Sequence, residues 1–342
     1  MDLQQSFQQA NPIPVLILFG PTASGKTGIL LELCADKQLN PQQIEVISAD
    51  SMQVYRGMDI GTAKPDAQQR QQLPHHLIDI CDPSQQFNAG DFVRIANETC
   101  IQIASRGRLP VVSGGTGFYL KNFILGLSEA PPSNKEIRAK LKQELNEKGA
   151  AVLMEELTSC DPVSAQRIHL NDEYRLLRAL EVYRICGQPL SSFEKNTQLH
   201  HGSEKRPNFQ FIIIGLSRPR EELYHRINLR CAQMFKQGLI DEVRSLYDAG
   251  YTPNDPGLRA IGYREFFIED ADEPNVWRLS QDLDGVQALV AQNSRRYAKR
   301  QITFFAGIPG VKWIECGHND KETAQQILKI INHEPTQTNT NP

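Results

Sequence analysis

The stretch G-P-T-A-S-G-K-T, residues 20–27, decides the fold. It follows the apolar run P-V-L-I-L-F, residues 14–19, which predicts a buried parallel strand, and it precedes a segment of helical period, residues 28–34. A strand, a glycine loop and a helix in this order are the context of a P-loop, and the pattern G-x-x-x-x-G-K-[ST] is met in full. The sequence therefore predicts binding of a diphosphate or triphosphate by the loop residues Gly20, Pro21, Thr22, Ala23, Ser24, Gly25, Lys26 and Thr27.

The chemistry of this loop follows from its residue types. Glycines let the backbone curl so that successive N–H groups point at phosphate oxygens, and the following helix adds its positive N-terminal end. Lys26 supplies a mobile positive charge, and the hydroxyl of Thr27 is a candidate ligand for Mg²⁺. The loop alone does not say which phosphate compound is bound, or for what reaction.

Composition sets the class of protein. The chain has 342 residues and a net charge of −3, so contact with a nucleic acid requires a local basic patch. Its seven cysteines form no C-x-x-C pair, which predicts neither a zinc site nor a disulfide framework and favours the cytoplasm. No apolar run approaches the roughly 20 residues that span a bilayer, so no membrane contact is expected. Residues 1–13 are expected to be a flexible leader and 331–342 a disordered tail.

Two further strand ends carry polar side chains. A strand over residues 44–48 leads to Asp50, and a strand over 109–113 leads to a glycine turn with Thr116. Because ligands of parallel sheets bind at the carboxyl ends of the strands, both side chains are expected to face the P-loop. Asp50 could instead be a helix N-cap, and the Thr116 turn could be an ordinary tight turn.

The predicted fold is α/β, with a P-loop-type parallel sheet and an inserted all-helical domain. The core comprises residues 14–130 and 205–330, because a strand over 209–215 resumes the sheet after the insertion at 131–204. Within the insertion Arg175 and Arg178 lie one helical turn apart, and its polar end, 194–207, is expected to be a flexible return. Arg226 and Arg230 lie at i and i+4 on the helix that follows the resumed strand.

A helix predicted at residues 285–305 carries a basic face, made of Arg295, Arg296, Lys299 and Arg300. Residues 286–302 include no acid, whereas surface helices usually mix charges. We therefore interpret the basic face as a contact for a nucleic-acid backbone, the alternative being an ordinary solvated surface.

Three functions compete at this point. A small-molecule kinase would need an aspartate after a later apolar strand, and a GTPase would need N-K-x-D; neither is present. A transferase that uses the P-loop to hold a diphosphate leaving group explains both an acid in the crevice and a separate basic helix. In that reading Asp50 accepts a proton from the nucleophile.

The motifs together resemble the tRNA dimethylallyltransferase family, the bacterial tRNA isopentenyltransferases. The resemblance rests on G-P-T-A-S-G-K-T, I-S-A-D-S-M-Q-V-Y-R-G-M-D-I-G-T-A-K-P (47–65), P-H-H-L-I-D-I-C-D-P (74–83) and G-G-T-G-F-Y (114–119). Further matches are N-D-E-Y-R-L-L-R-A-L-E-V (171–182), R-A-I-G-Y-R (259–264) and R-R-Y-A-K-R-Q (295–301). They imply transfer of a dimethylallyl group from dimethylallyl diphosphate, with Mg²⁺, to the exocyclic amine of adenosine 37 in the tRNA anticodon stem-loop.

The resemblance also implies roles for particular residues. Asp50 is the general base, Thr116 binds near the adenine or the diphosphate, and Arg226, with Arg230 as the alternative, clamps the diphosphate. The stretches that align with tRNA contacts include Asp50, Ser51, Met52, Gln53, Thr116, Arg138, Tyr174, Arg175, Leu176, Leu177, Arg178, Arg259, Ala260, Ile261, Gly262, Tyr263 and Arg264, beside the basic face.

Departures from the family pattern are few. Tyr174 stands where the family often has Gln, Leu170 where Pro is usual and Phe304 where Trp is common, which concerns details of anticodon-loop contacts. The nearest rival is adenylate isopentenyltransferase, which alkylates free AMP or ATP and needs neither the insertion nor the basic face. The family is often described as ATP-binding; we interpret the occupant of the loop as the prenyl diphosphate. No heptad repeat predicts assembly, so a monomer is expected.

Overall fold

A computed structural model describes residues 12–35, 44–193, 206, 208–317 and 319–333. The chain divides into two compact units, one made of Met1–Ile124 with Asn208–Pro342 and the other of Leu125–Pro207. The chain thus leaves the first unit once and returns to it. The boundaries of the insertion, expected at 131 and 204, lie at 125 and 207 in the structure.

The first unit is built on a six-stranded sheet with the order β3-β2-β4-β1-β5-β8, in which every pairing is parallel. Its central strand reads as an unbroken apolar run because helices cover both faces; Val15 to Phe19 are at most 1% exposed. The strands are β1 (Ile13–Phe19), β2 (Ile44–Ser48), β3 (His75–His76), β4 (Leu109–Gly114), β5 (Phe209–Ser217) and β8 (Lys312–Glu315). Ile13, expected in the leader, belongs to β1; residues 1–11 lie outside the described residues.

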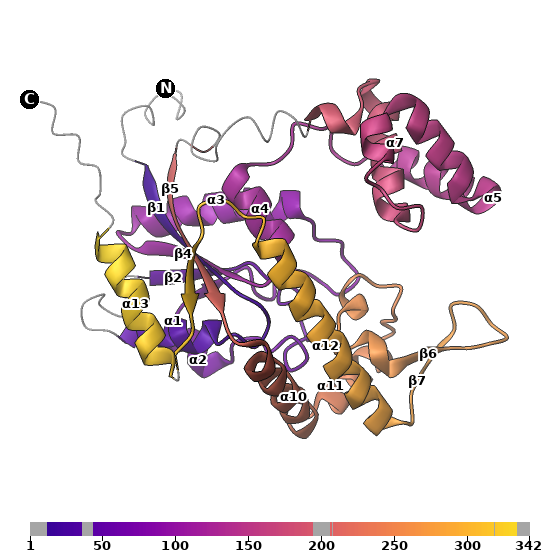
Figure 1. The fold of residues 1–342 in the computed structure, drawn as a ribbon. Coiled ribbons are helices and arrows are strands. Elements are labelled where there is room, and N and C mark those ends of the chain that lie inside the picture. The colour runs from indigo at the N-terminus through magenta and orange to yellow at the C-terminus, as the bar shows by residue number, and fades with distance from the viewer. Residues whose placement is uncertain (1–11, 36–43, 194–205, 207, 318, 334–342) are drawn as a thin grey trace, which may run out of the picture. The chain divides into compact units, whose positions relative to one another are not determined.

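Helices pack on the two faces of this sheet (Figure 1). On one face α1 (Lys26–Ala35) and α13 (Asp320–His333) bury Leu33 and Ile327 against Leu16 and Leu18. On the other lie α3 (Ala89–Ser105) and α4 (Gly117–Leu125), whose aromatic rings pack together and against β5; the short α2 (Ala67–Gln72) precedes β3. The tail was expected from residue 331, but residues 331–333 belong to α13, and 334–342 lie outside the described residues.

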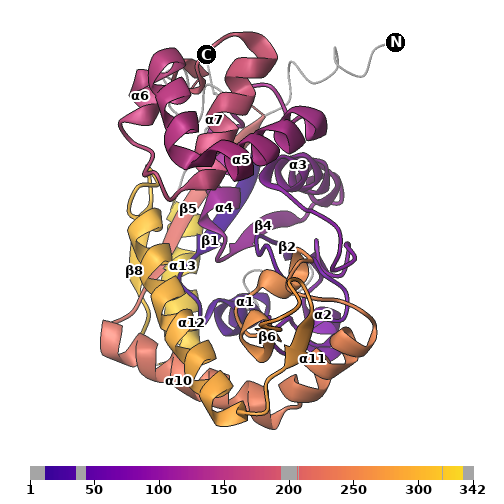
Figure 2. The same cartoon turned by 90° about the vertical axis from the view of Figure 1, so that its right-hand side faces the viewer.

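The remaining elements of the first unit follow β5. The long helices α10 (Arg220–Lys236) and α12 (Leu283–Phe305) lie side by side, as Figures 1 and 2 both show. Between them the chain forms α11 (Leu239–Asp248), two 3₁₀ turns, η1 (Gly257–Arg259) and η2 (Arg264–Phe266), and a small antiparallel pair, β6 (Phe267–Glu269) with β7 (Trp277–Leu279). Through α10, Arg226 reaches the P-loop that follows β1, and α12 carries the basic face.

The second unit is helical throughout its described part, as expected. It contains α5 (Lys135–Cys160), interrupted at Gly149 with φ 81°, and then α6 (Pro162–Ala165) and α7 (Glu173–Cys186). Its core is a leucine cluster that includes Leu141, Leu157 and Leu180. Of the predicted flexible return, residues 194–205 and 207 lie outside the described residues. No described helix in either unit is long and apolar enough to cross a membrane.

Candidate active site

The P-loop connects β1 to α1. Two of its residues have left-handed backbone, Ala23 with φ 63° and Gly25 with φ 101°, which curls the chain into a concave turn lined by N–H groups. Gly20 is required by close packing, because an added Cβ would lie 3.0 Å from the Cβ of Leu216 and 3.1 Å from its carbonyl oxygen. Lys26 bends back over the turn, and its Nζ donates hydrogen bonds to the carbonyl oxygens of Gly20 (2.9 Å) and Pro21 (3.0 Å).

Asp50 and Thr116 lie on two turns that are bonded to each other. Oδ1 of Asp50 accepts the N–H of Met52 at 2.9 Å, which holds the turn after β2, while no partner of Oδ2 lies among the described residues. Thr116, after β4, accepts the N–H of Ser51 on its hydroxyl (2.9 Å) and donates its own N–H to the carbonyl of Ala49 (3.0 Å). The sheet thus fixes the carboxylate and the hydroxyl turn as one rigid piece.

Two arginines of α10 complete the site. Nε of Arg226 donates to the carbonyl of Ala23 in the P-loop at 3.0 Å, and Nη2 of Arg230 approaches the carbonyl of Thr62 at 3.5 Å. Burial lowers the pKa of Arg230, an effect that the charge of Asp50 opposes. Burial and the charge of Arg230 lower the pKa of Lys26 to about 8, and Asp50 again opposes the shift. Lys26, Asp50 and Arg230 therefore influence one another's charges, and Arg226 contacts the loop beside them.

Three side chains at this site were not predicted from the sequence. In the P-loop, the N–H of Thr22 donates to Oε1 of Gln301 on α12 (2.8 Å), and the carbonyl of Ser24 accepts from Nε of Arg218 (2.9 Å). Burial, followed by the charge of Asp50, raises the pKa of the nearby Tyr297 to about 12. Gln301 and Arg218 contact residues 279 and 194 positions away, so no local spacing could have indicated these contacts.

Several predicted RNA contacts in the second unit need correction. Leu176 (0% exposed) and Leu177 (3%) belong to the helical core, so their side chains do not reach a ligand. Arg138 and Arg178 both form ion pairs with the buried carboxylate of Glu181, at 3.4 and 2.9 Å. The single charge of Glu181 is thus shared between the two guanidinium groups, and both side chains are held within the fold.

Tyr174 and Arg175 are the exposed members of that stretch. The tyrosine is 73% exposed, and the guanidinium of Arg138 lies over its ring at 4.8 Å from the centroid. Arg175 pairs with Asp172 at the helix start, 3.2 Å away. The surface of α7 therefore presents an aromatic ring and one partly paired cation.

Corrections also apply in the first unit. The amide of Gln53 is engaged internally, accepting from the Ser48 hydroxyl at 2.9 Å, and Tyr263 is fully buried. Ala260 is 6% exposed, and Arg259 donates to the backbone of its own turn. The side chains of Ala260 and Tyr263 thus belong to the fold, whereas Arg259 is exposed, and contact of the stretch 259–264 with RNA stays a prediction.

The basic face lies on α12 as predicted. Arg296, Lys299 and Arg300 are exposed, and Arg295 is half-buried with a hydrogen bond to Oδ1 of Asn228 at 2.5 Å. Within the described part of the chain none of the four forms an ion pair with an acid, so their charges remain available to an external anion.

The histidine pair makes structural contacts. His76 Nε2 lies 2.6 Å from Oε2 of Glu45, whose carboxylate also binds Arg106 (2.8 Å) and Arg108 (2.7 Å). Among the described residues, no group of three or more His, Cys, Asp or Glu could hold a metal ion.

Known proteins are similar to this chain in sequence and fold over most of their length. The family model for IPP transferase matches residues 53–307. A tRNA dimethylallyltransferase of Geobacter sulfurreducens is 42% identical over 327 residues, which are 95% of this chain and 99% of the relative. One of Acetivibrio thermocellus is 38% identical over 93% of this chain and 96% of its own.

Two solved structures are likewise similar to this chain over most of its length. The tRNA isopentenylpyrophosphate transferase from Bacillus halodurans is 36% identical, with a TM-score of 0.63 over 93% of this chain and 95% of that one. A eukaryotic dimethylallyltransferase acting on tRNA is 25% identical, with a TM-score of 0.76 over 96% of this chain and 82% of the other.

Proposed function

This chain belongs to the IPP transferase family, and we propose that it transfers a dimethylallyl group from dimethylallyl diphosphate to N6 of adenosine 37 in tRNA. In this reaction the amine nitrogen forms a bond to the first carbon of the dimethylallyl group, and the bond from that carbon to the diphosphate oxygen breaks. The electron pair leaves with the diphosphate, and the proton from nitrogen goes to Asp50. The product is N6-(dimethylallyl)adenosine.

The observation that carries this proposal is the arrangement of charges at the carboxyl ends of the strands. Lys26 and Arg226 contact the P-loop, and the charge of Arg230 acts on Lys26; here a diphosphate would gain negative charge as the leaving group departs. Asp50 is held by its Oδ1, so that Oδ2 is available to accept a proton from an acceptor amine. A kinase would need a carboxylate that holds a metal beside the phosphates, whereas Asp50 lies on the turn after β2, which is bonded to the turn of Thr116.

The residues present fit a Mg²⁺ ion bound with the donor. The Thr27 hydroxyl at the start of α1 is a hard oxygen ligand, and the diphosphate and water would supply most of the others, as is usual for Mg²⁺ in phosphate sites. The bound ion would neutralise charge on the leaving diphosphate. Lys26 would act on the same charge directly, together with Arg226 or, as the alternative, Arg230.

The basic face is proposed to bind the backbone of the tRNA anticodon stem-loop. Exposed cations without acidic partners gain most from contact with phosphates, because they release bound counterions. The target adenosine must leave its stack to reach Asp50, at a cost of a few kcal/mol that is smallest in a single-stranded loop. The exposed ring of Tyr174 in the helical unit offers a stacking surface for a second loop base.

The proposed cellular location follows from the substrate. A tRNA acceptor, seven free cysteines and the absence of a membrane-crossing helix in the described chain are consistent with a monomeric enzyme of the cytoplasm.

The test uses dimethylallyl diphosphate labelled in its prenyl group, incubated with Mg²⁺ and with either tRNA or AMP. Label in tRNA, found in N6-(dimethylallyl)adenosine after digestion, is the expected result. Label in AMP alone would identify an adenylate isopentenyltransferase. Transfer of the terminal phosphoryl group of ATP to a metabolite, with the prenyl diphosphate left intact beside tRNA, would reject the proposal.

A further inference from the structure

Gln301 joins the two halves of the active site through a single buried amide. It lies on α12 and is 4% exposed. Its Oε1 accepts the N–H of Thr22 in the P-loop at 2.8 Å, and its Nε2 donates to the carbonyl of Gly115 at 2.7 Å. Gly115 directly precedes Thr116, so the amide spans from the phosphate loop to the hydroxyl turn.

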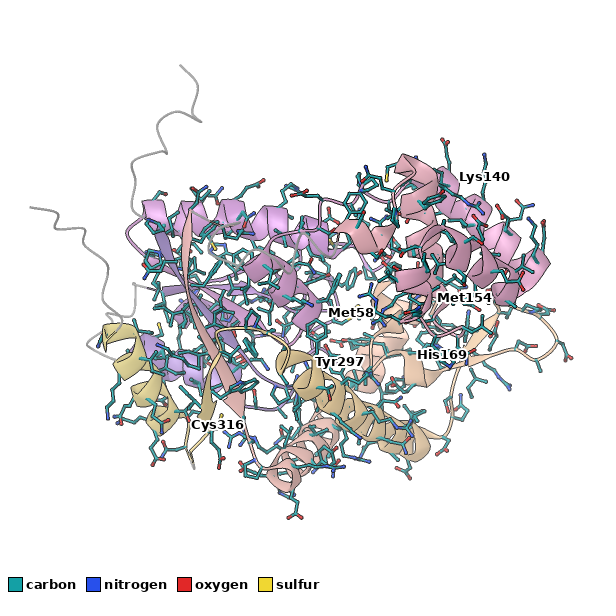
Figure 3. All side chains as sticks on the ribbon, turned by 45° about the horizontal axis from the view of Figure 1, so that its top comes forward. Met58, Lys140, Met154, His169, Tyr297 and Cys316 are labelled. Atoms are coloured by element: carbon teal, nitrogen blue, oxygen red, sulfur yellow. The ribbon has the colours of Figure 1, made fainter. Side chains whose placement is uncertain are left out.

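The fit around this amide is close. A Cβ added to Gly115 would lie only 2.4 Å from Nε2 of Gln301, so the absence of a side chain there is what lets the amide approach. One turn earlier on α12, the hydroxyl of Tyr297 approaches the same carbonyl of Gly115 at 3.5 Å; Figure 3 marks Tyr297 on the end of α12 nearer the sheet. Two side chains of one helix edge therefore converge on a single carbonyl group.

Loss of the amide would affect the phosphate loop in particular. Thr22 follows Gly20 and Pro21, whose carbonyl groups hold Lys26. If the N–H of Thr22 had no acceptor, this arm of the loop could shift, and the partners of Lys26 would shift with it. An amide can accept from Thr22 and donate to Gly115 at once, which neither a carboxylate nor a hydrocarbon of the same size can do.

We propose that Gln301 is a positioning residue for the prenyl diphosphate, distinct in effect from the basic face on the same helix. This inference rests on the proposed function. The inner edge of α12 sets the shape of the donor site through Gln301, and the outer side, with Arg296, Lys299 and Arg300, binds tRNA. Substitutions a turn apart on α12 should then change the affinity for different substrates.

The experiment compares Gln301→Leu and Gln301→Glu with Gln292→Leu, a control on the same helix whose side chain is exposed. The KM for dimethylallyl diphosphate is measured at saturating tRNA, and the KM for tRNA at saturating donor. Both Gln301 variants should raise the donor KM about tenfold or more, while the tRNA KM stays within about twofold. Gln301→Leu leaves the N–H of Thr22 without an acceptor. Gln301→Glu keeps that acceptor but sets a carboxylate against the carbonyl of Gly115, which pushes the two halves of the site apart. The control should leave both constants unchanged.

Binding of inorganic diphosphate with Mg²⁺, followed by titration calorimetry, gives a readout that does not depend on turnover. The Gln301 variants should bind it about tenfold more weakly than the wild type. An unchanged donor KM and unchanged diphosphate affinity would overturn the inference, as would an equal rise in both KM values. If Gln301→Leu does not fold, Gln301→Glu decides. Absence of prenyl transfer by the wild type would instead refute the proposed function, and the calorimetry would still test the role of Gln301.

Discussion

Glu242 of α11 offers the sharpest test of how the loop beside the active site is held. Its Oε2 accepts the backbone N–H groups of Asp59 (2.9 Å) and Ile60 (2.8 Å). Its Oε1 accepts the N–H of Gly61 (3.1 Å) and the hydroxyl of Tyr263 (2.6 Å). One half-buried carboxylate thus receives four donors, and the change Glu242→Gln replaces one of its two acceptor atoms by a donor.

The magnitude follows from the number of bonds lost. A glutamine oxygen retains two of the four donors, and the new NH₂ group faces the other two without accepting either. Hydrogen bonds to charged groups contribute about 1.5–3 kcal/mol each. Because Glu242 is only partly buried, we take the lower value, and expect the free energy of unfolding to fall by about 3 kcal/mol.

The same change should reach the active site. The loop held by Glu242 continues into Thr62 and Ala63, whose carbonyl groups accept from the amide of Gln53 and, at Thr62, from Arg230. Loosening this loop removes a partner of Arg230, a cation proposed to bind the diphosphate. The donor KM should therefore rise in the variant, measured at a temperature at which it is fully folded.

Urea unfolding measures the stability, with Asp241→Asn as the control. Asp241 is the neighbouring acid on the same helix, and its side chain is 81% exposed, so its change should alter stability by no more than about 0.5 kcal/mol. A loss below about 1 kcal/mol for Glu242→Gln would show that the four contacts contribute no more than one ordinary hydrogen bond, and would refute the reasoning.

Other predictions concern single charges. Asp50→Asn should lower kcat by about 10²–10⁴-fold with little change in tRNA affinity, since it removes the base but not the turn; normal turnover would exclude that role. The pKa of Lys26 is lowered to about 8, so its charge is present below pH 8 and lost as pH rises through that value. The affinity for diphosphate should therefore fall above about pH 8. In the variant Lys26→Met this fall should be absent from the plot of affinity against pH. Changing all four residues of the basic face to Ala should flatten the dependence of log tRNA affinity on log salt by about 3, and an unaltered slope would argue against phosphate contacts. Burial opposes ionisation of Glu45, but its three basic partners outweigh burial and lower its pKa to about 2. The stabilisation from these ion pairs is therefore complete above about pH 4.5 and is lost as pH falls towards 2. Glu45→Gln should make Tm depend less on pH in this acid range.

The sequence predicts the centre of the fold well and its edges poorly. Strands such as β1 and β5 are buried on both faces, and their apolar runs are therefore visible without a structure. The edge strand β8, with the sequence K-W-I-E, buries only Ile314, and no apolar run distinguishes it from a loop. The strands β6 and β7 have three residues each, too few for a period to appear. Helix α13 has a clear helical pattern and could have been predicted.

At the site, the features that could be predicted are those made of residues close together in the sequence. The P-loop and the Asp50 turn are short motifs whose function is encoded by adjacent residues. Gln301 and Arg218 depend on the fold to reach the loop. The arginines of the insertion were over-interpreted because charge was considered without its partner: Glu181 lies three positions after Arg178, on the same helix, and is fully buried. A buried acid beside two cations indicates a structural network before it indicates RNA binding.

The distribution of charge explains how a phosphate-binding loop serves a carbon transfer. In the free protein Lys26 is held by two carbonyl groups, and burial and Arg230 oppose its charge more than Asp50 favours it. A bound diphosphate would supply an anionic partner for this charge, and would gain more from it as the leaving group departs and its negative charge grows. Asp50 lies on the separate β2 turn, bonded to the hydroxyl turn of Thr116, where its charge can serve the acceptor. Cations on the side of the leaving group and a carboxylate on the side of the nucleophile stabilise opposite ends of one transition state, and Gln301 fixes the distance between the two sides.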